Sequence, residues 1–285
     1  MRVLITGKNS FLGKEIQDFF YDKEYDIIPT SRQTLDVSDP NNVDDYFENI
    51  KVDIVIHTAI MGGTRLRKDT TEDYINNINM FSNLLRNNHK YSLLLNFGSG
   101  AEFDRKNGVV ETKGIHRGDY VPGDFYGAAK NVIARQIQEL DDNVINMRLF
   151  GCFGKYETDQ RFIKNSINNI NKGKPLEIHQ NKKMDFISAE DTCRVIDYYI
   201  KNHKYIKLPT DINLCYGKKN TLIDVANQIC NLMNVEKNVI IKQEDTAPEY
   251  TGCAEKLEKL NIKLDGFDIG LQRMIESIDT IKKRL

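Results

Sequence analysis

The sequence predicts an α/β fold in which a doubly wound parallel sheet carries a smaller C-terminal α/β lobe. Over the first 150 of the 285 residues, short apolar runs alternate with helical patterns, which indicates a parallel sheet with helices on its faces. Several of these runs are apolar throughout, as strands covered on both faces are. The first run leads through a glycine turn into a helix, so we expect right-handed connections.

The elements of the first half follow from these patterns in order. Residues 2–6 are β-branched or apolar and end at Gly7, and residues 11–20 repeat apolar side chains at helical spacing. Further strands are expected at residues 25–30, 34–37, 53–59 and 92–98, and helices at residues 43–50 and 71–88.

The second half opens with a polar, glycine-rich segment, residues 104–123, that we expect to form one long loop. Loops of that length inside compact domains are usually functional. Helices are then expected from residue 126 and at residues 161–171, 191–201, 221–233 and 270–285, and strands at residues 143–150, 176–179, 185–189, 212–216 and 239–242. Thr221 and Asp224 have capping-box spacing at the start of their helix.

Composition excludes several classes of function. With 40 Lys and Arg against 41 Asp and Glu, the formal net charge is −1, so no overall field attracts nucleic acid or an anionic membrane. The five cysteines are scattered, and neither they nor the five histidines have metal-ligand spacing. No apolar stretch is long enough to span a bilayer, so we expect a cytoplasmic protein with reduced thiols and no metal.

The first turn has the features of a dinucleotide-binding site. Ser10 lies between Gly7 and Gly13, where a third glycine would complete the spacing Gly-x-x-Gly-x-x-Gly. Glycines at such a turn let the backbone approach a pyrophosphate, which the free amides of the helix N-terminus then bind. We therefore expect Gly7, Ser10, Phe11, Leu12 and Gly13 to contact a dinucleotide in a Rossmann-type domain.

The end of the second strand bears on the choice of cofactor. An acidic residue there would bond the ribose hydroxyls and exclude a 2′-phosphate, but residues 29–33 contain no carboxylate. Arg32 has the charge and donors to hold a 2′-phosphate, although it could also be an ordinary surface arginine. We therefore favour NADP(H) as the cofactor, with NAD(H) possible.

Tyr126 and Lys130 are the candidates for acid–base chemistry. They lie four residues apart, about one helical turn, so both side chains point the same way. An ammonium beside a phenol favours the phenolate and lowers its pKa toward the range useful for proton transfer. The same spacing is common on helices without a catalytic role, so the interpretation depends on the surrounding motifs.

With those motifs, the chain resembles an extended short-chain dehydrogenase/reductase of the nucleotide-sugar epimerase, dehydratase and reductase type. The glycine turn, Ser99 and the pair at 126 and 130 match that family's motifs in order, and the separation 126 − 99 = 27 suits its triad. Residues 148–154, 172–175 and 184–191 resemble its later motifs. The resemblance implies that Ser99, Tyr126 and Lys130 are catalytic, and that Tyr126 and Lys130 also contact the cofactor.

The resemblance also implies roles for residues around the cofactor. It places Asp36 on the adenine amino group, Val37 beside the adenine ring, and Thr58 and Ala59 along the nicotinamide ribose. Asn77 stands where an asparagine of the family stabilises the strand at residues 53–59.

Within the family, residues 61–63 and the Arg32 region are nearest in type to GDP-L-fucose synthase and similar 4-keto sugar reductases. Two departures are informative. Dehydratases carry an acidic pair after the serine, where this chain has Gly100 and Ala101. The cysteine and histidine that fucose synthases use for epimerisation correspond to Ala101 and Arg161. Plain ketone reduction is therefore favoured over dehydration or ring epimerisation.

Five residues are candidates for substrate binding: Gly62, Glu102, Gly151, Arg161 and Lys183. Glu102 is interpreted as a substrate contact or base, or as a polar residue at the pocket rim. Gly151 replaces an asparagine of the family, and Lys183 adjoins the position of its diphosphate-binding arginine. Arg161 is either a phosphate ligand or a surface arginine.

These features predict an NADP(H)-dependent reductase of a keto nucleotide-diphosphate sugar, of the 4-keto-6-deoxy type, in surface-glycan sugar biosynthesis. The alternatives are an NAD-dependent nucleotide-sugar 4-epimerase or sugar dehydrogenase, and a catalytically idle regulatory subunit that binds the cofactor. Residues 1–150 are expected to form the Rossmann domain, and residues 151–285 mainly the substrate lobe, with about 185–216 returning to the Rossmann domain. The resemblance also implies a homodimer that packs residues 71–88 and the Tyr126 helix into a four-helix bundle.

Overall fold

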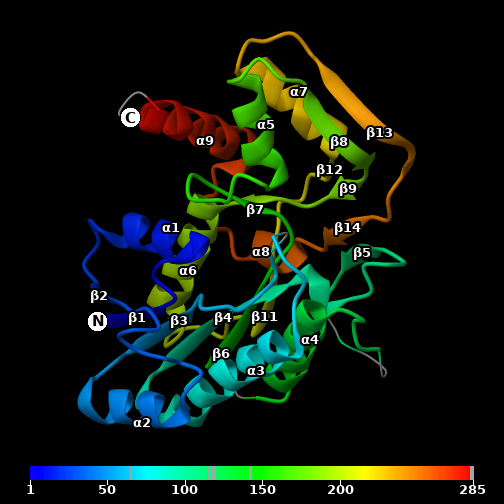
Figure 1. Ribbon diagram of the computed structural model, residues 1–285. Helices are drawn as coiled ribbons and strands as arrows, with labels where there is room; N and C mark the ends of the chain where they lie inside the picture. Colours follow the sequence, from blue (N-terminus) through cyan, green and yellow to red (C-terminus); the bar gives the residue numbers. More distant parts are fainter. Residues whose placement is uncertain (65, 115, 117–119, 141–142, 283–285) are drawn as a thin grey trace.

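A six-stranded parallel sheet forms the centre of the computed structural model, which describes residues 1–64, 66–114, 116, 120–140 and 143–282 (Figure 1). Its strand order is β11-β6-β4-β3-β1-β2, and each neighbouring pair is parallel. This is the doubly wound arrangement that the alternating pattern predicts. The strands are β1 Arg2–Thr6, β2 Asp26–Pro29, β3 Ile54–His57, β4 Leu93–Ser99, β6 Val144–Leu149 and β11 Asp211–Leu214.

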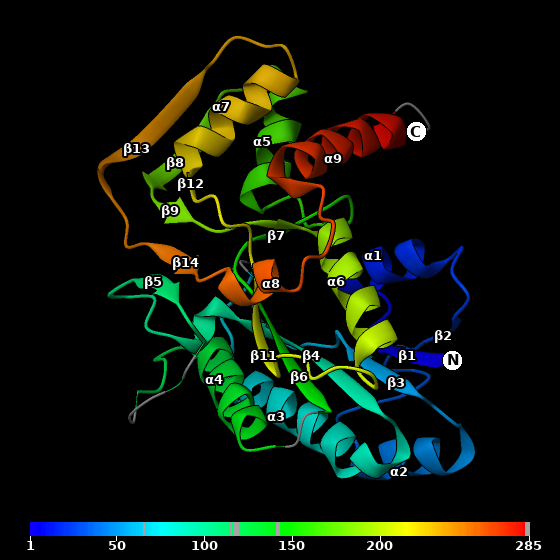
Figure 2. The ribbon, with the colours of Figure 1, turned by 180° about the vertical axis from the view of Figure 1, so that it is seen from behind.

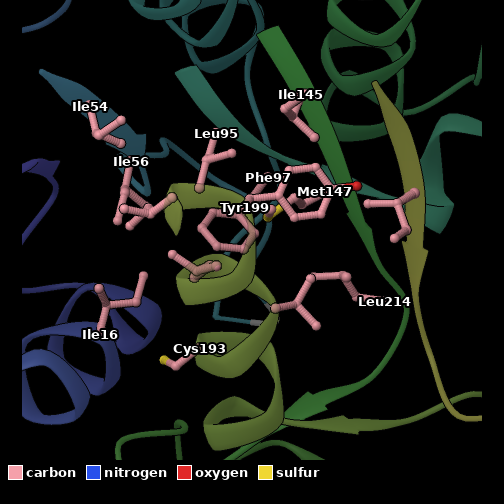
Figure 3. Packing of buried hydrophobic residues seen from close by; sticks show 14 of the residues in the cluster. Ile16, Ile54, Ile56, Leu95, Phe97, Ile145, Met147, Cys193, Tyr199 and Leu214 are labelled. Atoms are coloured by element: carbon pink, nitrogen blue, oxygen red, sulfur yellow. The ribbon is translucent and has the colours of Figure 1, made fainter. Parts of the chain in front are cut away.

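Helices cover both faces of the sheet, because successive side chains of a buried strand point to opposite sides. Val3 and Ile5 pack toward α1 (Phe11–Phe20) and α6 (Ala189–Asn202). Figure 3 shows Leu95 and Met147 of the sheet on the side of α6 that carries Tyr199. Leu4 packs on the other face, toward α2, α3 and α4. Those helices are α2 Pro40–Asn49, α3 Thr71–Arg86 and α4 Phe125–Gln138.

A smaller α/β lobe lies beyond the carboxyl ends of the strands (Figures 1 and 2). It has a four-stranded sheet in the order β12-β9-β14-β5 and two strand pairs, β13-β8 and β10-β7. Its strands are β5 Val109–Thr112, β7 Cys152–Phe153, β8 Leu176–Asn181, β9 Lys183–Met184, β10 Ile187–Ser188, β12 Asn220–Thr221, β13 Val239–Thr246 and β14 Tyr250–Gly252. Its helices are α5 Phe162–Ile170, α7 Leu222–Leu232, α8 Glu255–Lys259 and α9 Gly266–Lys282.

The expected strand at residues 34–37 is wrong. The segment turns instead, and the amides of Thr34 and Leu35 donate to the carbonyl of Ser31. Leu35 and Val37 are nonetheless buried in the core on the α2 and α3 face, which accounts for the apolar alternation. Two buried side chains that anchor a loop give the same short pattern as a strand.

The long loop expected at residues 104–123 is interrupted by β5, which pairs in parallel with β14. The partner strand lies about 140 residues further along the chain, so no local pattern announces the pairing. Val110 is largely exposed, and the four-residue strand therefore lacks an alternating apolar face.

Segments from the second half of the chain return to the central sheet, where β11 pairs with β6 and α6 covers one face. The boundary at residue 150 stays a prediction. In the part of the chain that the structure describes, every helix is too short or too polar to span a lipid bilayer.

Candidate active site

The glycine turn between β1 and α1 is shaped by close contacts. Gly7 has a φ of +72°, and a Cβ there would lie 2.7 Å from the Ala59 backbone. A Cβ on Gly13 would lie 2.3 Å from the Gly7 carbonyl oxygen. Ser10 caps α1, and its hydroxyl accepts a bond of 3.0 Å from the Gly13 amide. The turn thus brings the start of a helix next to a backbone that has no side chain at Gly7 or Gly13, which fits a pyrophosphate.

The ends of β1 and β3 are joined beside this turn. The Thr58 hydroxyl donates to the Thr6 carbonyl at 2.6 Å and lies 3.1 Å from the Ser10 hydroxyl. Asn77 on α3 donates to the Met61 carbonyl at 2.8 Å and accepts from the Met61 amide at 2.9 Å. Asn77 therefore fixes the segment that follows β3, close to the role that the resemblance implies.

Arg32 lies after β2 with its side chain 65% exposed, and its Nε donates to Asp36 at 3.1 Å. Burial acts to raise the pKa of Asp36, but hydrogen bonds from Ser38 and the charge of Arg32 outweigh it and leave the pKa below its usual value of 3.8. Arg32 is thus held at the edge of the sheet, where we expect the adenosine end of the cofactor. The roles of Arg32, Asp36 and the buried Val37 toward a cofactor stay predictions.

Ser99 ends β4, and its side chain begins a short turn of 3-10 helix at Gly100–Glu102. The Ser99 hydroxyl accepts a hydrogen bond of 3.1 Å from the Ala101 amide. The Ser99 amide donates to Glu102 at 2.8 Å. This reciprocal cap places the serine hydroxyl at the carboxyl end of the central strand, which is where ligands bind in open α/β sheets.

Tyr126 enters from the first turn of α4, which Asp124 caps through a bond of 2.8 Å from the Gly127 amide. The ring packs on Gly63, where an added Cβ would lie 2.8 Å from two ring carbons. Gly63 itself is fixed by a bond of 2.7 Å from its amide to Asp69. The segment that carries Gly62 and Gly63 therefore forms one wall against the phenol.

Burial raises the pKa of Tyr126, while hydrogen bonding with Ser99 and the charges of Arg161 and Arg105 act to lower it. The expectation that Lys130 lowers this pKa stays a prediction. The Lys130 ammonium lies 6.0 Å from the centre of the Tyr126 ring and donates instead to the Phe97 carbonyl at 2.6 Å. The two side chains share a helix face, as the spacing predicts, but the ammonium is turned toward β4.

Lys130 is itself unusual because it is buried. Burial lowers its pKa to about 8, and the negative charge of Glu102 acts in the opposite direction. A lysine in this range exchanges its proton easily near neutral pH.

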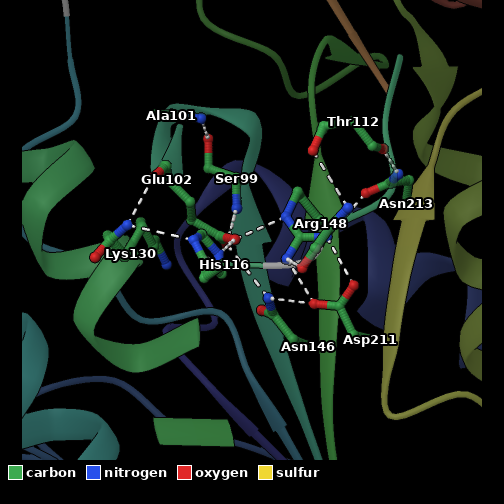
Figure 4. A network of polar contacts seen from close by, with 12 residues as sticks. Ser99, Ala101, Glu102, Thr112, His116, Lys130, Asn146, Arg148, Asp211 and Asn213 are labelled. Atoms are coloured by element: carbon green, nitrogen blue, oxygen red, sulfur yellow. Dashed lines mark hydrogen bonds and ion pairs between the residues drawn. The ribbon is translucent and has the colours of Figure 1, made fainter. Parts of the chain in front are cut away.

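Glu102 does not lie at the pocket rim, and that expectation is wrong. Its side chain has 0% exposure and pairs with Arg148, also 0% exposed, at 2.7 Å (Figure 4). Arg148 continues to Asp211 at 2.5 Å, and His116 lies 3.1 Å from Glu102. Burial acts to raise the pKa of Glu102, but Arg148 and His116 outweigh it and lower the pKa. Glu102 therefore compensates a buried arginine beneath Ser99.

The other candidates for substrate binding, Gly151, Arg161 and Lys183, have different surroundings in the structure. A Cβ on Gly151 would lie 2.7 Å from the Asp185 carbonyl oxygen, so the neighbouring backbone fills the place of the expected asparagine. Arg161 Nε donates to Glu157 at 2.6 Å, and its charge acts on the pKa of Tyr126. Lys183, on β9, lies 3.4 Å from Glu249. Their contacts with a substrate stay predictions.

Two residues near Ser99 were missed from the sequence. Tyr250 on β14 and Arg105, after the 3-10 turn, both interact electrostatically with Tyr126. Neither stands in a recognisable motif, and Tyr250 reaches the site only because β14 pairs with β5 and β9. In the part of the chain that the structure describes, no group of three or more His, Cys, Asp or Glu could hold a metal ion.

Comparison with known proteins places this geometry in a family. The model of the NAD dependent epimerase/dehydratase family matches residues 3–215. A GDP-L-colitose synthase from Yersinia pseudotuberculosis is 25% identical over 255 residues, 82% of each chain. A GDP-6-deoxy-D-talose 4-dehydrogenase from Aggregatibacter actinomycetemcomitans is 24% identical over 273 residues, 90% of each chain. The solved structure of a GDP-mannoheptose C4 reductase from Campylobacter jejuni with NADP bound has the same fold, with a TM-score of 0.80 and 20% identity over 98% of each chain. Since the family model spans well over half of the residues, the chain belongs to the NAD dependent epimerase/dehydratase family, as its motifs predict.

Proposed function

We propose that the protein is an NADP(H)-dependent reductase of a keto nucleotide-diphosphate sugar, of the 4-keto-6-deoxy type, in surface-glycan sugar biosynthesis. The observation that carries the proposal is the grouping of Ser99, Tyr126 and Lys130 at the carboxyl end of β4. The buried pairing of Glu102 with Arg148 supports reduction over dehydration or epimerisation, because the carboxyl nearest in sequence to Ser99 has its charge compensated by Arg148.

The residues divide the chemistry of reduction between them. When bound, the reduced nicotinamide supplies the hydride for the ketone carbon. The phenol of Tyr126 gives its proton to the oxygen that becomes the hydroxyl, and the Ser99 hydroxyl hydrogen-bonds that oxygen. Lys130 holds positive charge near the Tyr126 phenolate that this transfer leaves. Solvent then returns a proton to the phenolate. A raised pKa keeps Tyr126 protonated, and therefore competent as an acid, at neutral pH.

The proposed substrate class rests on the relatives. The two relatives and the solved reductase are all named for GDP-linked sugars. GDP-linked keto sugars are therefore the first compounds to test. The decisive experiment follows NADPH oxidation at 340 nm with GDP-, UDP- and dTDP-linked 4-keto sugars. We expect turnover with a GDP compound and loss of turnover in Tyr126→Phe. Equal rates in the two proteins would contradict the assignment of Tyr126.

The preference for NADP(H) depends on Arg32. We expect Arg32→Ala to weaken NADPH binding by about tenfold or more, the effect of losing one charge-assisted phosphate contact, and to leave NADH binding unchanged. Arg86→Ala is the matched control. Arg86 is also an exposed arginine, but it lies on α3 and pairs with Asp44 of α2. An unchanged ratio of NADPH to NADH affinity in Arg32→Ala would remove the basis of the preference.

A second candidate is oxidation in place of reduction, because one relative is named a 4-dehydrogenase. The same triad would then accept a proton from a sugar hydroxyl while NAD(P)⁺ is reduced. Equilibrium assays in both directions distinguish these cases. Tightly bound NAD⁺ in the purified protein, with interconversion of two sugars and no added reductant, would favour a 4-epimerase.

We also propose that two copies pair through α3 and α4. Ile75 on α3 and Phe125 on α4 are exposed apolar residues, and the two helices pack side by side on the same face of the sheet. Light scattering after size exclusion should give twice the 32.9 kDa chain mass for the wild type. The monomer mass is expected for Ile75→Glu.

A further inference from the structure

Tyr250 reaches the active site from a part of the chain that the known motifs do not cover. It lies on β14, whose register sets Tyr250 opposite Val109 of β5 and Met184 of β9. The side chain is 9% exposed, and its ring packs edge to face on Phe150 at 5.2 Å. The strand pairing and the ring contact together fix the direction of the phenol.

That direction is toward the turn that follows Ser99. A Cβ added to Gly100 would lie 2.8 Å from Tyr250 Cζ, the ring carbon that carries the hydroxyl. The phenol end of Tyr250 is therefore stacked over the residue directly after Ser99. A side chain at Gly100 would meet the Phe150 ring at 2.6 Å as well as this phenol, which explains why this position is a glycine with ordinary backbone angles.

The Ser99 hydroxyl has a limited set of hydrogen bonds to make. A serine hydroxyl offers one donor and two acceptor positions. The Ala101 amide occupies one acceptor position at 3.1 Å. If a second donor fills the other acceptor position, the hydroxyl hydrogen points at a further acceptor. A hydroxyl that accepts two hydrogen bonds is also a stronger donor.

Two phenols face this hydroxyl. The phenols of Tyr126 and Tyr250 both interact with the Ser99 side chain, whose hydroxyl has a single hydrogen to give. Burial dominates at Tyr250, where the charges of Glu102 and Tyr126 add to it and that of Arg105 opposes it, so its pKa is raised well above 10.0. Tyr250 is consequently protonated at all working pH values and available as a donor.

We propose that Tyr250 is a positioning residue that donates its hydroxyl hydrogen to Ser99 Oγ and thereby directs the Ser99 hydrogen at the substrate oxygen facing Tyr126. The inference rests on the proposed reductase function for its kinetic consequences. The proposed hydrogen bond between Tyr250 and Ser99 lies within the protein, so one of the two tests needs no substrate.

The kinetic test is a double-mutant cycle on the full chain. Tyr250→Phe should lower kcat by about tenfold, the worth of one oriented hydrogen bond in the transition state, with KM unchanged. In a Ser99→Ala background the same substitution should have no further effect on kcat. A full additional loss in that background, or a rise in KM alone, would mean that Tyr250 touches substrate directly and would overturn the proposal, as would an unchanged kcat in Tyr250→Phe.

The structural test separates this inference from the reductase assignment. Crystal structures of the wild type and of Tyr250→Phe, each with NADP⁺, should show Tyr250 Oη within about 3.2 Å of Ser99 Oγ in the wild type. A single Ser99 rotamer is expected in the wild type, and mixed rotamers in the variant. A separation beyond about 3.5 Å in the wild type excludes the hydrogen bond, whatever the substrate proves to be.

Tyr91→Phe is the control for deleting a buried phenol hydroxyl. Tyr91 is 6% exposed and donates to the Leu84 carbonyl at 2.7 Å, beneath the sheet and away from Ser99. Its removal should change the melting temperature about as much as Tyr250→Phe does, with kcat unaltered. Loss of kcat in both variants would assign the effect of Tyr250→Phe to general loosening of the fold.

Discussion

Lys130 is the residue for which burial and function conflict most directly. Its pKa falls from 10.5 to about 8 on folding. Below pH 8 the charge is present in both the folded and the unfolded chain, so the full cost of burying it acts on the folded state. Between pH 8 and 10.5 the folded protein releases the proton first, and this cost disappears as the pH rises.

Lys130→Met should therefore stabilise the protein at pH 7, by up to about 3 kcal/mol for a shift of this size, while abolishing turnover. The stabilisation should shrink as the pH is raised from 8 to 10. Melting temperatures across this range measure the effect, and Lys174→Met, at an exposed position, is the control, with no trend expected. A Lys130→Met protein less stable than the wild type at every pH would contradict the argument.

Tyr126 gives a complementary prediction at the same scale. Removing the hydroxyl in Tyr126→Phe should lower kcat by about 10²–10⁴-fold, the usual contribution of a general acid. NADPH affinity, measured by fluorescence titration, should stay within about twofold, because the phenol contributes little to holding the cofactor in comparison with the glycine turn. Loss of both activity and cofactor binding would instead indicate a damaged site.

At the scale of elements, the segment after β3 positions the phenol. Gly63 has a φ of +66° and contacts Tyr126, whereas Gly173 has a φ of +65° with nothing within 4 Å of an added Cβ. The two glycines thus share a left-handed backbone conformation, but only Gly63 lies against the Tyr126 ring. Comparing alanine substitutions at the two sites isolates the contribution of the wall.

Gly63→Ala and Gly173→Ala should each lose about 1 kcal/mol of unfolding free energy through the left-handed backbone. Only Gly63→Ala should also lower kcat/KM, by about tenfold or more, since a displacement of about 1 Å at a reacting group can cost a hundredfold. Urea unfolding and steady-state kinetics supply the two measurements. Equal kinetic effects would show that the contact with Tyr126 does not matter.

Asn77 links α3 to the same wall. Its side chain makes both a donor and an acceptor bond to Met61, so Asn77→Ala leaves two partly buried backbone groups unpaired, at a cost of about 1 kcal/mol in unfolding free energy. Asn79→Ala, on the exposed side of α3, should cost less than about 0.5 kcal/mol. Chemical denaturation of the two variants tests this, and equal losses would contradict a specific role for Asn77.

At the scale of the whole molecule, the Arg148 network ties β4, β6 and β11 together. Arg148→Met would leave Glu102 and Asp211 as buried or nearly buried charges without their arginine partner, at an expected cost of about 3–5 kcal/mol at pH 7. The contribution of Glu102 is present at neutral pH and is lost as the pH falls below its usual value of 4.5, since its folded pKa is lowered.

Adding Glu102→Gln to Arg148→Met should recover part of that loss, because one uncompensated charge is removed. Arg86→Met is the control, since its pair with Asp44 is about half exposed on both sides and should contribute at most about 1 kcal/mol. Urea unfolding at pH 7 compares the three variants. A double variant no more stable than Arg148→Met alone would contradict the electrostatic explanation.

The sequence by itself determined the features that depend on local spacing. Apolar runs and helical repeats predicted the parallel sheet, because the periods of strands and helices are written in neighbouring residues. Glycines at the first turn, Ser99 and the pair of Tyr126 and Lys130 matched a family through order and spacing, and the family model confirms that family.

The tertiary structure decided what depends on partners distant in the chain. Glu102 looked like a residue of the pocket, yet Arg148, 46 positions away, holds it in the core. Lys130 shares a face with Tyr126 but bonds to β4, and Tyr250 reaches Ser99 only through strand pairing across about 140 residues. The physical reason is that the charge state of a buried group and the neighbours of a hydroxyl are set by long-range packing, which leaves no periodic trace in the sequence.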